Sequence, residues 1–424
     1  MIDNLFESEI KGGGLFKDAS VLSPHYVPDR LPHRKQETKQ IIRIVGPILR
    51  GIKPNNIFLY GKTGTGKTVV TRHVTRELVN IASDPAKNKN KVRIECVYMN
   101  CRVGYNSKYQ VLVKILEDEA LNKAGYAKKP LEGRGGSKLA GLSPTALYER
   151  LKSSIEANQV NLIVVLDEVD MIKDVDDLLY ILTRINDEIG KGSVSLIGIS
   201  NKYSFKDVLD SRSKSTLCEE ELVFKPYNAN QLKTILTQRV QMGFKKRAIS
   251  SSGIGLIAAY GAHTNGDARY ALRLLKKSGE LAEAAGRKMI TNDDVKAAKV
   301  KVEEDITYEI ISTLPEPQQI VLLAIAETLL SGGSYKRLED SAGVLFSGEV
   351  YEAYERICKS LGVKSRTMRW FREYLNDLEM LGLITLSISG KGVRGNTSLI
   401  RLGNAPEEVK KIVSESLGLT RLAE

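Results

Sequence analysis

The chain has 424 residues, of which 42% are hydrophobic and 27% charged, so it is long enough for two or three globular domains with real cores. No apolar run approaches the ~18 residues that a membrane span needs, and residues 1–20 do not resemble a signal peptide. We therefore expect a cytoplasmic protein without a membrane partner. The net charge of +12 favours a polyanionic partner, and the four cysteines have no paired metal-ligand spacing.

The N-terminal part of the chain precedes the first regular elements. Residues 1–32 read as an irregular lead-in, and a first helix is expected from near His33 or Arg34 to about Leu49. A short buried strand at 57–60 and a helix at 69–81 follow. The sequence thus predicts a turn from strand to helix between Gly61 and Thr68.

This turn fits the phosphate-loop pattern G-x-x-x-x-G-K-[ST], with Gly61, Gly66, Lys67 and Thr68 at the fixed places. Glycines let several backbone N–H groups point at one anion, and the helix N-terminus adds its positive dipole end. Lys67 can reach the β- and γ-phosphates, and Thr68 can ligate magnesium. The alternative is an ordinary glycine-rich turn, which the Lys-Thr pair and both flanking elements disfavour.

Strands and helices alternate from here to about Pro226. The expected strands are 91–100, 162–166, 194–199 and 222–224, and the expected helices between them are 107–123, 144–157 and 175–189. This alternation predicts a doubly wound α/β domain with a parallel sheet.

Polar residues end two of these strands. Asp167 and Glu168 follow the apolar strand 162–166, and Asn201 follows the strand 194–199. Beside a phosphate loop, Asp167 can hold magnesium and Glu168 can orient and deprotonate an attacking water. Asn201 can hydrogen-bond the γ-phosphate or the water, although an Asn after a strand often only makes a turn. Surface acids at a strand end are the alternative for the two carboxylates.

The C-terminal half contains no further parallel strand pattern. Residues 228–302 read as about four helices, and residues 225–302 carry 15 Lys and Arg against 5 Asp and Glu. After the breaker sequence 314–317, three helices (318–330, 350–361 and 367–381) and two strands (383–388 and 398–402) are expected. This order is typical of a winged helix-turn-helix, which binds DNA or, in other cases, protein.

Basic residues mark two candidate DNA contacts in this winged helix. Arg366, Arg369 and Arg372 lie on or near the exposed face at the start of the recognition helix 367–381. Lys391 and Arg394 lie in the glycine-rich loop between the two strands, which is the candidate wing.

The combination of these motifs resembles a known family. The order of a phosphate loop, an Asp-Glu strand end, an Asn strand end and a helical lid is similar to an AAA+ ATPase. Further motifs resemble the archaeal replication initiators, which are akin to eukaryotic origin-recognition and cell-division-cycle proteins. These motifs are Tyr-Val-Pro-Asp-Arg-Leu-Pro-His-Arg at 26–34, Asn-Cys-Arg at 100–102, Pro-Tyr-Asn at 226–228, Gly-Asp-Ala-Arg at 266–269 and the winged helix. The resemblance covers about residues 20–405.

The resemblance implies a division into four parts and a set of roles. The parts are the lead-in 1–32, an AAA+ P-loop NTPase core 33–226 with an initiator-specific insertion at about 102–142, an all-helical lid 227–303 and a winged-helix DNA-binding domain 304–424. The phosphate-binding residues would be Gly61, Thr63, Gly64, Thr65, Gly66, Lys67 and Thr68, and the other nucleotide-lining residues Val27, Tyr227 and Arg239. Asn201 would be the first sensor, Arg269 the second sensor and Arg212 an arginine finger for a neighbouring molecule, although Ser211-Arg212 departs from the usual Pro-Arg.

The implied activity is a slow ATPase that acts as a switch. ATP or ADP with Mg²⁺ would be the cofactors, and the implied partners are double-stranded origin DNA, other initiator paralogues and the replicative helicase. The protein would then be associated with the nucleoid. Two rival functions remain at this point: a transposition or helicase-loader ATPase that acts on DNA without sequence preference, and a signalling ATPase whose winged helix binds protein.

Overall fold

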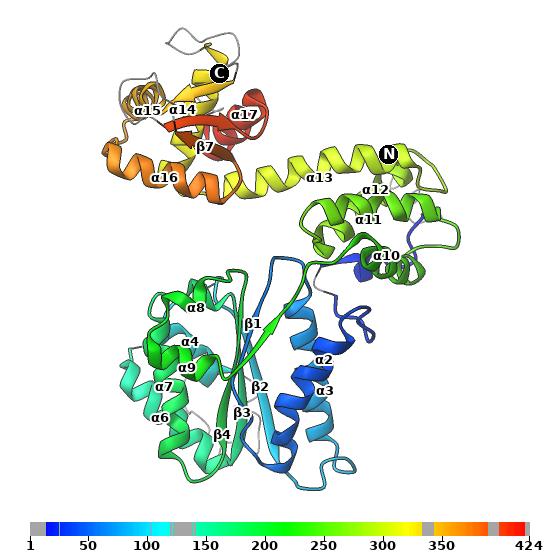
Figure 1. Cartoon of the computed structure of the whole chain (residues 1–424), viewed down its shortest axis with the longest axis vertical. Coiled ribbons are helices and arrows are strands. Elements are labelled where there is room, and N and C mark those ends of the chain that lie inside the picture. The colour runs from blue at the N-terminus through cyan, green and yellow to red at the C-terminus, as the bar shows by residue number, and fades with distance from the viewer. Residues whose placement is uncertain are drawn as a thin grey trace, which may run out of the picture. The chain divides into compact units, whose positions relative to one another are not determined.

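The computed structural model describes residues 14–24, 26–102, 104–118, 121, 139, 141–332, 343–388 and 398–419. The chain divides into two compact units, Met1–Ala298 and Lys299–Glu424, whose elements are labelled in Figure 1. The first unit holds a parallel sheet and a helical lid, and the second holds a smaller antiparallel sheet with helices.

The sheet of the first unit contains five parallel strands in the order β2-β3-β4-β1-β5. The strands are β1 (Ile57–Tyr60), β2 (Arg93–Asn100), β3 (Val160–Asp167), β4 (Ser193–Ser200) and β5 (Glu220–Val223). Every residue of β3 and β4 is buried, as expected for central strands covered on both faces. The register pairs Asn100 with Asp167 and Asp167 with Ile199, so the carboxyl ends of these strands meet at one edge.

Helices cover both faces of this sheet (Figure 1). On one side lie α2 (Lys35–Val45) and α3 (Lys67–Ser83). On the other lie α4 (Lys108–Glu117), α6 (Pro144–Asn158), α7 (Val175–Glu188), α8 (Phe205–Val208) and α9 (Ser211–Leu217). The doubly wound α/β prediction is therefore confirmed.

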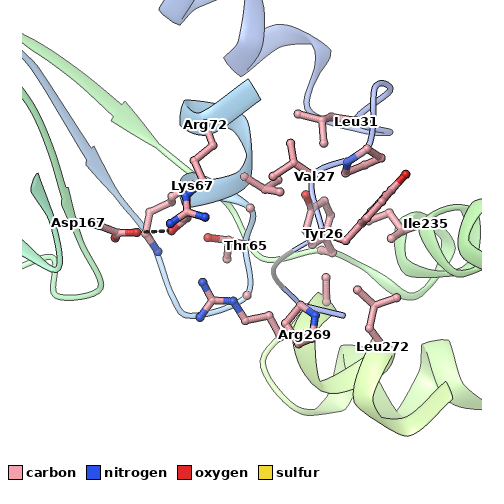
Figure 2. A pocket seen from close by; sticks show the side chains of 18 of the residues that line it. Tyr26, Val27, Leu31, Thr65, Lys67, Arg72, Asp167, Ile235, Arg269 and Leu272 are labelled. Carbon is pink, nitrogen blue, oxygen red and sulfur yellow. Dashed lines mark hydrogen bonds between the residues drawn. The ribbon is translucent and has the colours of Figure 1, made fainter. Parts of the chain in front are cut away.

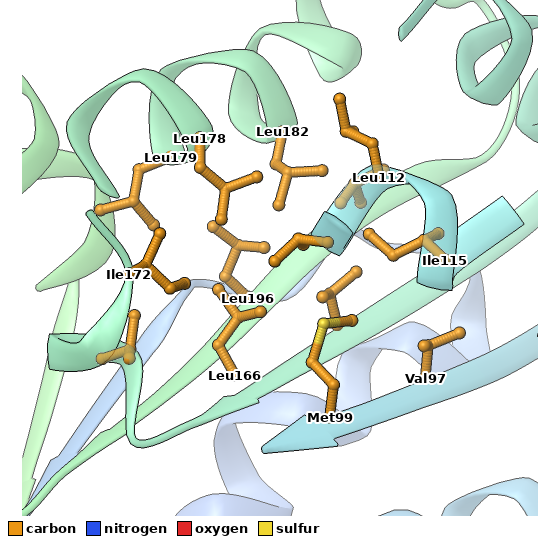
Figure 3. Close-up of a cluster of buried hydrophobic side chains, with 14 of the residues drawn as sticks. Val97, Met99, Leu112, Ile115, Leu166, Ile172, Leu178, Leu179, Leu182 and Leu196 are labelled. Carbon is orange, nitrogen blue, oxygen red and sulfur yellow. The ribbon is translucent and has the colours of Figure 1, made fainter. Parts of the chain in front are cut away.

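The alternation of side chains along the strands produces two hydrophobic cores. In β1, Ile57 and Leu59 join the core beneath α2 and α3, whereas Phe58 and Tyr60 join the core beneath α4, α6 and α7. Figure 3 shows the second core, where leucines of α7 pack against Leu166 and Leu196 of the sheet. Each fully buried side chain of this kind contributes roughly 1.5–3 kcal/mol, which fixes the sheet edge that carries the polar residues.

Two helices of the first unit end earlier than the sequence predicted, and the short helices α8 and α9 were not predicted. The first helix ends at Val45 and continues to Arg50 only as a 3₁₀ turn, because Pro47 lacks an N–H and its ring clashes with a regular α-helical turn. The helix expected at 107–123 ends at Glu117, and Asp118 already has an extended conformation (φ −66°, ψ 134°).

The lid contains helices α10 (Ala229–Gly243), α11 (Ser251–His263), α12 (Ala268–Ala284) and the start of α13 (Asn292–Ser312), so the expected four helices are present. α13 runs past the expected end at 302 and continues into the second unit, which begins at Lys299. The lead-in is more regular than expected, because its described part packs on this lid. The Lys17 N–H donates to the Gly243 carbonyl over 2.8 Å, and the rings of Phe16 and Phe244 lie 4.8 Å apart. A 3₁₀ turn at Ala19–Leu22 buries Val21 and Leu22. Apolar residues scattered among polar ones gave no periodic signal for this packing.

The second unit has a winged-helix arrangement with its own core. Its elements are α14 (Glu316–Leu330), β6 (Val344–Phe346), α15 (Ser347–Ser360), α16 (Met368–Met380), β7 (Ile384–Ile388), β8 (Ser398–Leu402) and α17 (Pro406–Ser416). The three strands form an antiparallel sheet in the order β6-β8-β7. Sequence analysis missed β6, which has only three residues, and α17, although α17 buries Val409, Ile412 and Val413 at helical spacing. Across the described parts of both units, no helix is long and apolar enough to cross a membrane.

Candidate functional site

A cavity of about 360 Å³ opens at the edge of the sheet where the polar residues end β3 and β4 (Figure 2). Its walls come from the phosphate loop, the segment before α2 and the lid helices α10 and α12. The candidate residues that line it are Val27, Gly64, Thr65, Gly66, Lys67, Thr68, Asp167, Glu168, Asn201, Tyr227, Arg239 and Arg269. Gly61, Thr63 and Arg212 do not line it.

The glycines of the phosphate loop allow its tight turn. Gly64 and Gly66 have φ values of 72° and 92°, in the left-handed region that other residues rarely adopt. A Cβ atom on Gly64 would also lie 1.8 Å from the Asp267 carboxylate of the lid. Gly66 is the N-cap of α3, so the loop ends at a helix N-terminus that faces the cavity. Backbone N–H groups at a helix N-terminus favour binding of an anion.

Three hydrogen bonds hold the Lys67 ammonium at the phosphate-loop end of the cavity. Its Nζ donates to the Gly61 carbonyl over 2.6 Å, to the Lys62 carbonyl over 3.0 Å and to Asn201 Oδ1 over 2.9 Å. Burial lowers the pKa of Lys67 to about 8, although nearby Asp167 and Glu168 oppose this shift. The lysine thus joins the loop to the end of β4, as the spacing of the motifs predicted.

Asp167 and Thr68 form an oxygen-rich pair beside Lys67. The Thr68 hydroxyl donates to Asp167 Oδ2 over 2.7 Å, and the Asp167 side chain is buried. A carboxylate and a hydroxyl are hard oxygen ligands of the kind that Mg²⁺ accepts. Within the described residues no cluster of three or more His, Cys, Asp or Glu could hold a metal by itself. This fits Mg²⁺, which protein sites commonly bind through one or two carboxylates together with substrate phosphates.

Glu168 adopts a strained backbone conformation at the end of β3. Its φ of 56° lies in the left-handed region, which costs a non-glycine residue on the order of 1–3 kcal/mol. Its carboxylate is next to Asn100, with 3.5 Å between Nδ2 and Oε1, and Arg102 Nη1 lies 3.9 Å from Oε2. The left-handed backbone conformation of Glu168 ends the strand, and its carboxylate lines the cavity together with Asp167.

The turn between α11 and α12 brings the lid against the phosphate loop. The Ala268 N–H donates to the Gly64 carbonyl over 3.2 Å, and Lys62 Nζ donates to Asn265 Oδ1 over 2.8 Å. The Asp267 carboxylate caps α12 by accepting from the Arg269 N–H over 2.7 Å. Figure 2 shows the Arg269 side chain reaching from α12 towards the phosphate loop. Its charge is close enough to disfavour the protonated form of Lys67 and so contributes to the lowered pKa of that lysine.

The other end of the cavity is largely apolar. It is lined by Tyr26, Val27, Leu31, Ile235 and Leu272, among others.

Two neighbouring polar residues of α10 stand at this apolar end. Arg239 Nη2 donates to the Tyr26 carbonyl over 3.3 Å, but Arg239 Nε and Nη1 and Gln238 Oε1 are buried without hydrogen-bond partners among the described residues. Burial lowers the pKa of Arg239. An apolar slot with unpaired donors and an unpaired acceptor fits a nucleobase, whose edge offers both.

Four residues of the cavity region escaped the sequence analysis as functional candidates. Arg72, Tyr98 and Gln238 line the cavity, and Arg34 packs beside it against Tyr227, 4.0 Å from the ring centre. Arg34 is the last residue of the motif at 26–34. The motif marked Arg34 as a residue shared with the family, but it did not predict which groups Arg34 contacts. The other three lie inside regular elements, where sequence alone gives no sign that they reach a site.

The remaining candidates lie elsewhere. Arg212 is exposed at the start of α9, where it lines a smaller hollow with Asp176, Asp177 and Asp210. Arg366, Arg369 and Arg372 are exposed at and after the turn that begins α16 in the second unit. Lys391 and Arg394 lie outside the described residues, as do Lys128, Lys129, Arg134 and Lys138 of the expected insertion.

Comparisons with known families agree with this arrangement of domains. Residues 30–197 match the AAA ATPase domain, residues 233–300 match the Cdc6 AAA+ ATPase-type lid domain, and residues 309–412 match the CDC6 C-terminal winged helix domain.

Full-length relatives are similar over almost the whole chain. The ORC1-type DNA replication protein 1 of Sulfurisphaera tokodaii is 40% identical over 98% of this chain and 96% of its own length. The ORC1-type DNA replication protein of Thermococcus onnurineus is 39% identical over 97% and 94%. The solved structure of Aeropyrum pernix ORC1 in complex with DNA matches with a TM-score of 0.80 and 36% identity, covering 96% of this chain and 99% of that one. The phosphate loop, the lid and the winged helix occur together because this chain belongs to the ORC1-type DNA replication proteins.

Proposed function

We propose that this replication protein is an initiator that binds origin DNA and is switched by ATP or ADP with Mg²⁺ in the cavity. The observation that carries the nucleotide part is the convergence of Lys67, the Thr68–Asp167 pair, Glu168 and Arg269 on one cavity. These side chains come from the core and the lid, so a bound phosphate chain would touch both. A nucleotide can therefore control the angle between core and lid.

The chain's own residues would divide the work as follows. The N–H groups of the phosphate loop and Lys67 bind the phosphates, and Thr68 and Asp167 hold Mg²⁺, which neutralises charge on the phosphate oxygens. Glu168 orients a water and accepts its proton, Asn201 holds the water or the γ-phosphate, and Arg269 binds the γ-phosphate from the lid. The apolar slot holds the adenine.

We further propose that hydrolysis is slow in an isolated molecule. Arg212 does not line the cavity of its own chain. An arginine that acts on a neighbour's nucleotide would contribute only when another initiator molecule docks. Initiator paralogues are therefore the proposed partners for this step, and the replicative helicase is the proposed downstream partner.

The DNA part of the proposal rests on α16. Arg366, Arg369 and Arg372 are exposed at its N-terminal end, the end that enters the major groove in helix-turn-helix proteins. The Aeropyrum pernix relative, which is 36% identical and covers 96% of this chain, was solved in complex with DNA. We propose that residues 33–226 act as the ATPase core, 227–303 as the lid and 304–424 as the DNA-binding domain. The insertion at about 102–142 is proposed as a second DNA contact.

Two variants test the nucleotide part. Lys67→Ala removes the central cation and is expected to lose nucleotide binding. Glu168→Gln keeps the shape but removes the base, so it should bind ATP without turning it over. Lys191→Gln, which changes an exposed lysine just before β4, is the control. Nucleotide affinity and phosphate release are measured together, and normal hydrolysis by Glu168→Gln would remove this residue as the base.

A footprint on the genome's non-coding regions tests the DNA part. Protection of a defined repeat supports an origin-binding initiator. Uniform, sequence-independent protection would instead favour a loader that acts on any DNA, and no DNA binding would favour a winged helix that binds protein.

A further inference from the structure

Asp167 Oδ2 accepts two hydrogen bonds, which come from two different elements of the fold. One comes from the Thr68 hydroxyl over 2.7 Å, and the other comes from the Tyr98 hydroxyl over 2.5 Å. The second oxygen, Oδ1, accepts from the Glu168 N–H over 3.1 Å. Hydrogen bonds thus hold both oxygens of the carboxylate. Thr68 belongs to the phosphate loop and Glu168 directly follows β3, whereas Tyr98 comes from the neighbouring strand β2.

The sheet register explains why Tyr98 can reach Asp167. Tyr98 lies on β2 opposite Val165 of β3, two residues before the pair of Asn100 and Asp167. Alternate residues of a strand point to the same face, so Tyr98 and Asn100 share the face of the sheet that α3 covers at this edge. The long phenol side chain spans the remaining distance to the end of the neighbouring strand.

The Tyr98 ring is fixed by a residue of α3. Arg72 of α3 packs across the ring, with its guanidinium 4.0 Å from the ring centre. Figure 2 shows Arg72 on the same side of the cavity as Lys67 and Asp167. The stacked arginine holds the ring in place.

We propose that Tyr98 is a positioning residue for the magnesium end of the site, and that it acts by fixing the rotamer of Asp167 beside Thr68. This inference rests on the proposed nucleotide function. Asp167 must present an oxygen to the metal from the arrangement that also accepts from the Thr68 hydroxyl. Groups that hold metal ligands through hydrogen bonds commonly change metal affinity 10–100-fold when they are removed.

The test compares Tyr98→Phe with the wild-type chain. Phenylalanine keeps the ring and its contact with Arg72 but removes the donor to Asp167. Tyr109→Phe is the matched control, because the Tyr109 hydroxyl also donates a hydrogen bond, to the Leu139 carbonyl, and does not line the cavity. The readout is the affinity for a fluorescent ADP, measured in EDTA and across a series of Mg²⁺ concentrations at constant ionic strength.

For Tyr98→Phe we expect an unchanged affinity in EDTA and a Mg²⁺ requirement that rises by about tenfold. The extra thermal stabilisation that Mg²⁺ adds to ADP should shrink in parallel, which gives a second readout without hydrolysis. An unchanged Mg²⁺ requirement would overturn the proposal. An equal loss of ADP affinity in EDTA and in Mg²⁺ would overturn it as well, because that pattern indicates a general structural role.

The wild-type and Asp167→Asn proteins separate this inference from the function on which it rests. If wild-type protein binds no ADP, or binds it without any effect of Mg²⁺, the proposed nucleotide function itself fails. If wild-type protein and Asp167→Asn differ in their Mg²⁺ requirement while Tyr98→Phe matches the wild type, only the role of Tyr98 is wrong.

Discussion

The Arg34 guanidinium lies 4.0 Å from the centre of the Tyr227 ring, at the point where the core continues into the lid. Its Nε donates to the Thr65 carbonyl of the phosphate loop over 2.9 Å, and its Nη2 donates to the Lys225 carbonyl over 2.5 Å. One buried cation therefore joins the phosphate loop to the connection between β5 and α10. A change in the loop on nucleotide binding would reach the lid connection through this side chain.

The first prediction concerns this link. Arg34→Lys keeps the charge but cannot make the planar set of hydrogen bonds or stack on Tyr227. We expect the first unit to lose on the order of 2 kcal/mol of stability and ADP to bind more weakly, since two carbonyls lose their donor. Thermal unfolding and nucleotide titration measure both effects. Arg30→Lys, an exposed change in the same segment, is the control, and a variant as stable as the control would contradict the link.

The second prediction is a pH dependence of nucleotide affinity. In the free protein burial lowers the pKa of Lys67 to about 8, and phosphate groups beside the ammonium would raise that pKa in the complex. Binding therefore takes up a proton above pH 8, so affinity should be constant below pH 7 and fall as pH rises from 8 to 9.5.

The slope of this fall can approach tenfold per pH unit. Lys67→Arg keeps a charged group over the whole pH range and should remove this dependence. A wild-type affinity that is flat up to pH 9.5 would contradict the lowered pKa.

The limits of sequence reasoning follow from the same residues. The sheet, the lid and the winged helix were predictable because buried strands and amphipathic helices carry periodic signals, and the phosphate loop has fixed spacing. Contacts such as Tyr98 with Asp167 or Arg34 with Thr65 join residues 69 and 31 positions apart, and the fold alone brings them together. The packing of Phe16 on Phe244 escaped prediction for the same reason.

The third prediction concerns the second sensor. Arg269 extends from the lid towards the phosphate loop, so Arg269→Ala would remove the proposed contact to the γ-phosphate, a group that ADP lacks. We expect ADP affinity to stay within about twofold and ATP turnover to fall by about tenfold or more, the loss of one charged stabilising contact. Lys276→Ala, on the exposed side of the same helix, is the control. An unchanged turnover in a folded variant would refute the role of Arg269.

The fourth prediction concerns recognition of the adenine ring. Gln238 Nε2 donates to the Arg30 carbonyl over 3.0 Å, and this contact orients the amide so that Oε1 is left as an acceptor without a partner among the described residues. The amino group of adenine can satisfy this acceptor, whereas the carbonyl oxygen of inosine in ITP cannot. Wild-type protein should therefore prefer ATP over ITP by about tenfold. Gln238→Leu should bind the two nucleotides equally, and a preserved preference would assign base recognition to other groups.

The fifth prediction concerns DNA at α16. Trp370, the only tryptophan of the chain, is 56% exposed on this helix, between Arg369 and Arg372. If α16 enters the major groove, DNA should change the fluorescence emission of Trp370.

Arg369→Ala should relax sequence preference by about 1–3 kcal/mol if the side chain reads a guanine. Arg366→Ala should weaken binding to all sequences and lower the salt slope by about one if the side chain contacts a phosphate. Lys411→Ala on α17 is the exposed control.

A fragment of residues 299–424 completes this test, because the second unit has its own hydrophobic core. If the insertion at about 102–142 also binds DNA, the intact chain should bind more tightly than the fragment and lose affinity more steeply with salt, since it releases more counterions. Both proteins should still protect the same central bases through α16. Two contacts fixed on one chain would also bend or untwist the duplex, because they rarely match straight B-DNA. A fragment that equals the intact chain in affinity and in salt slope would confine DNA binding to the winged helix.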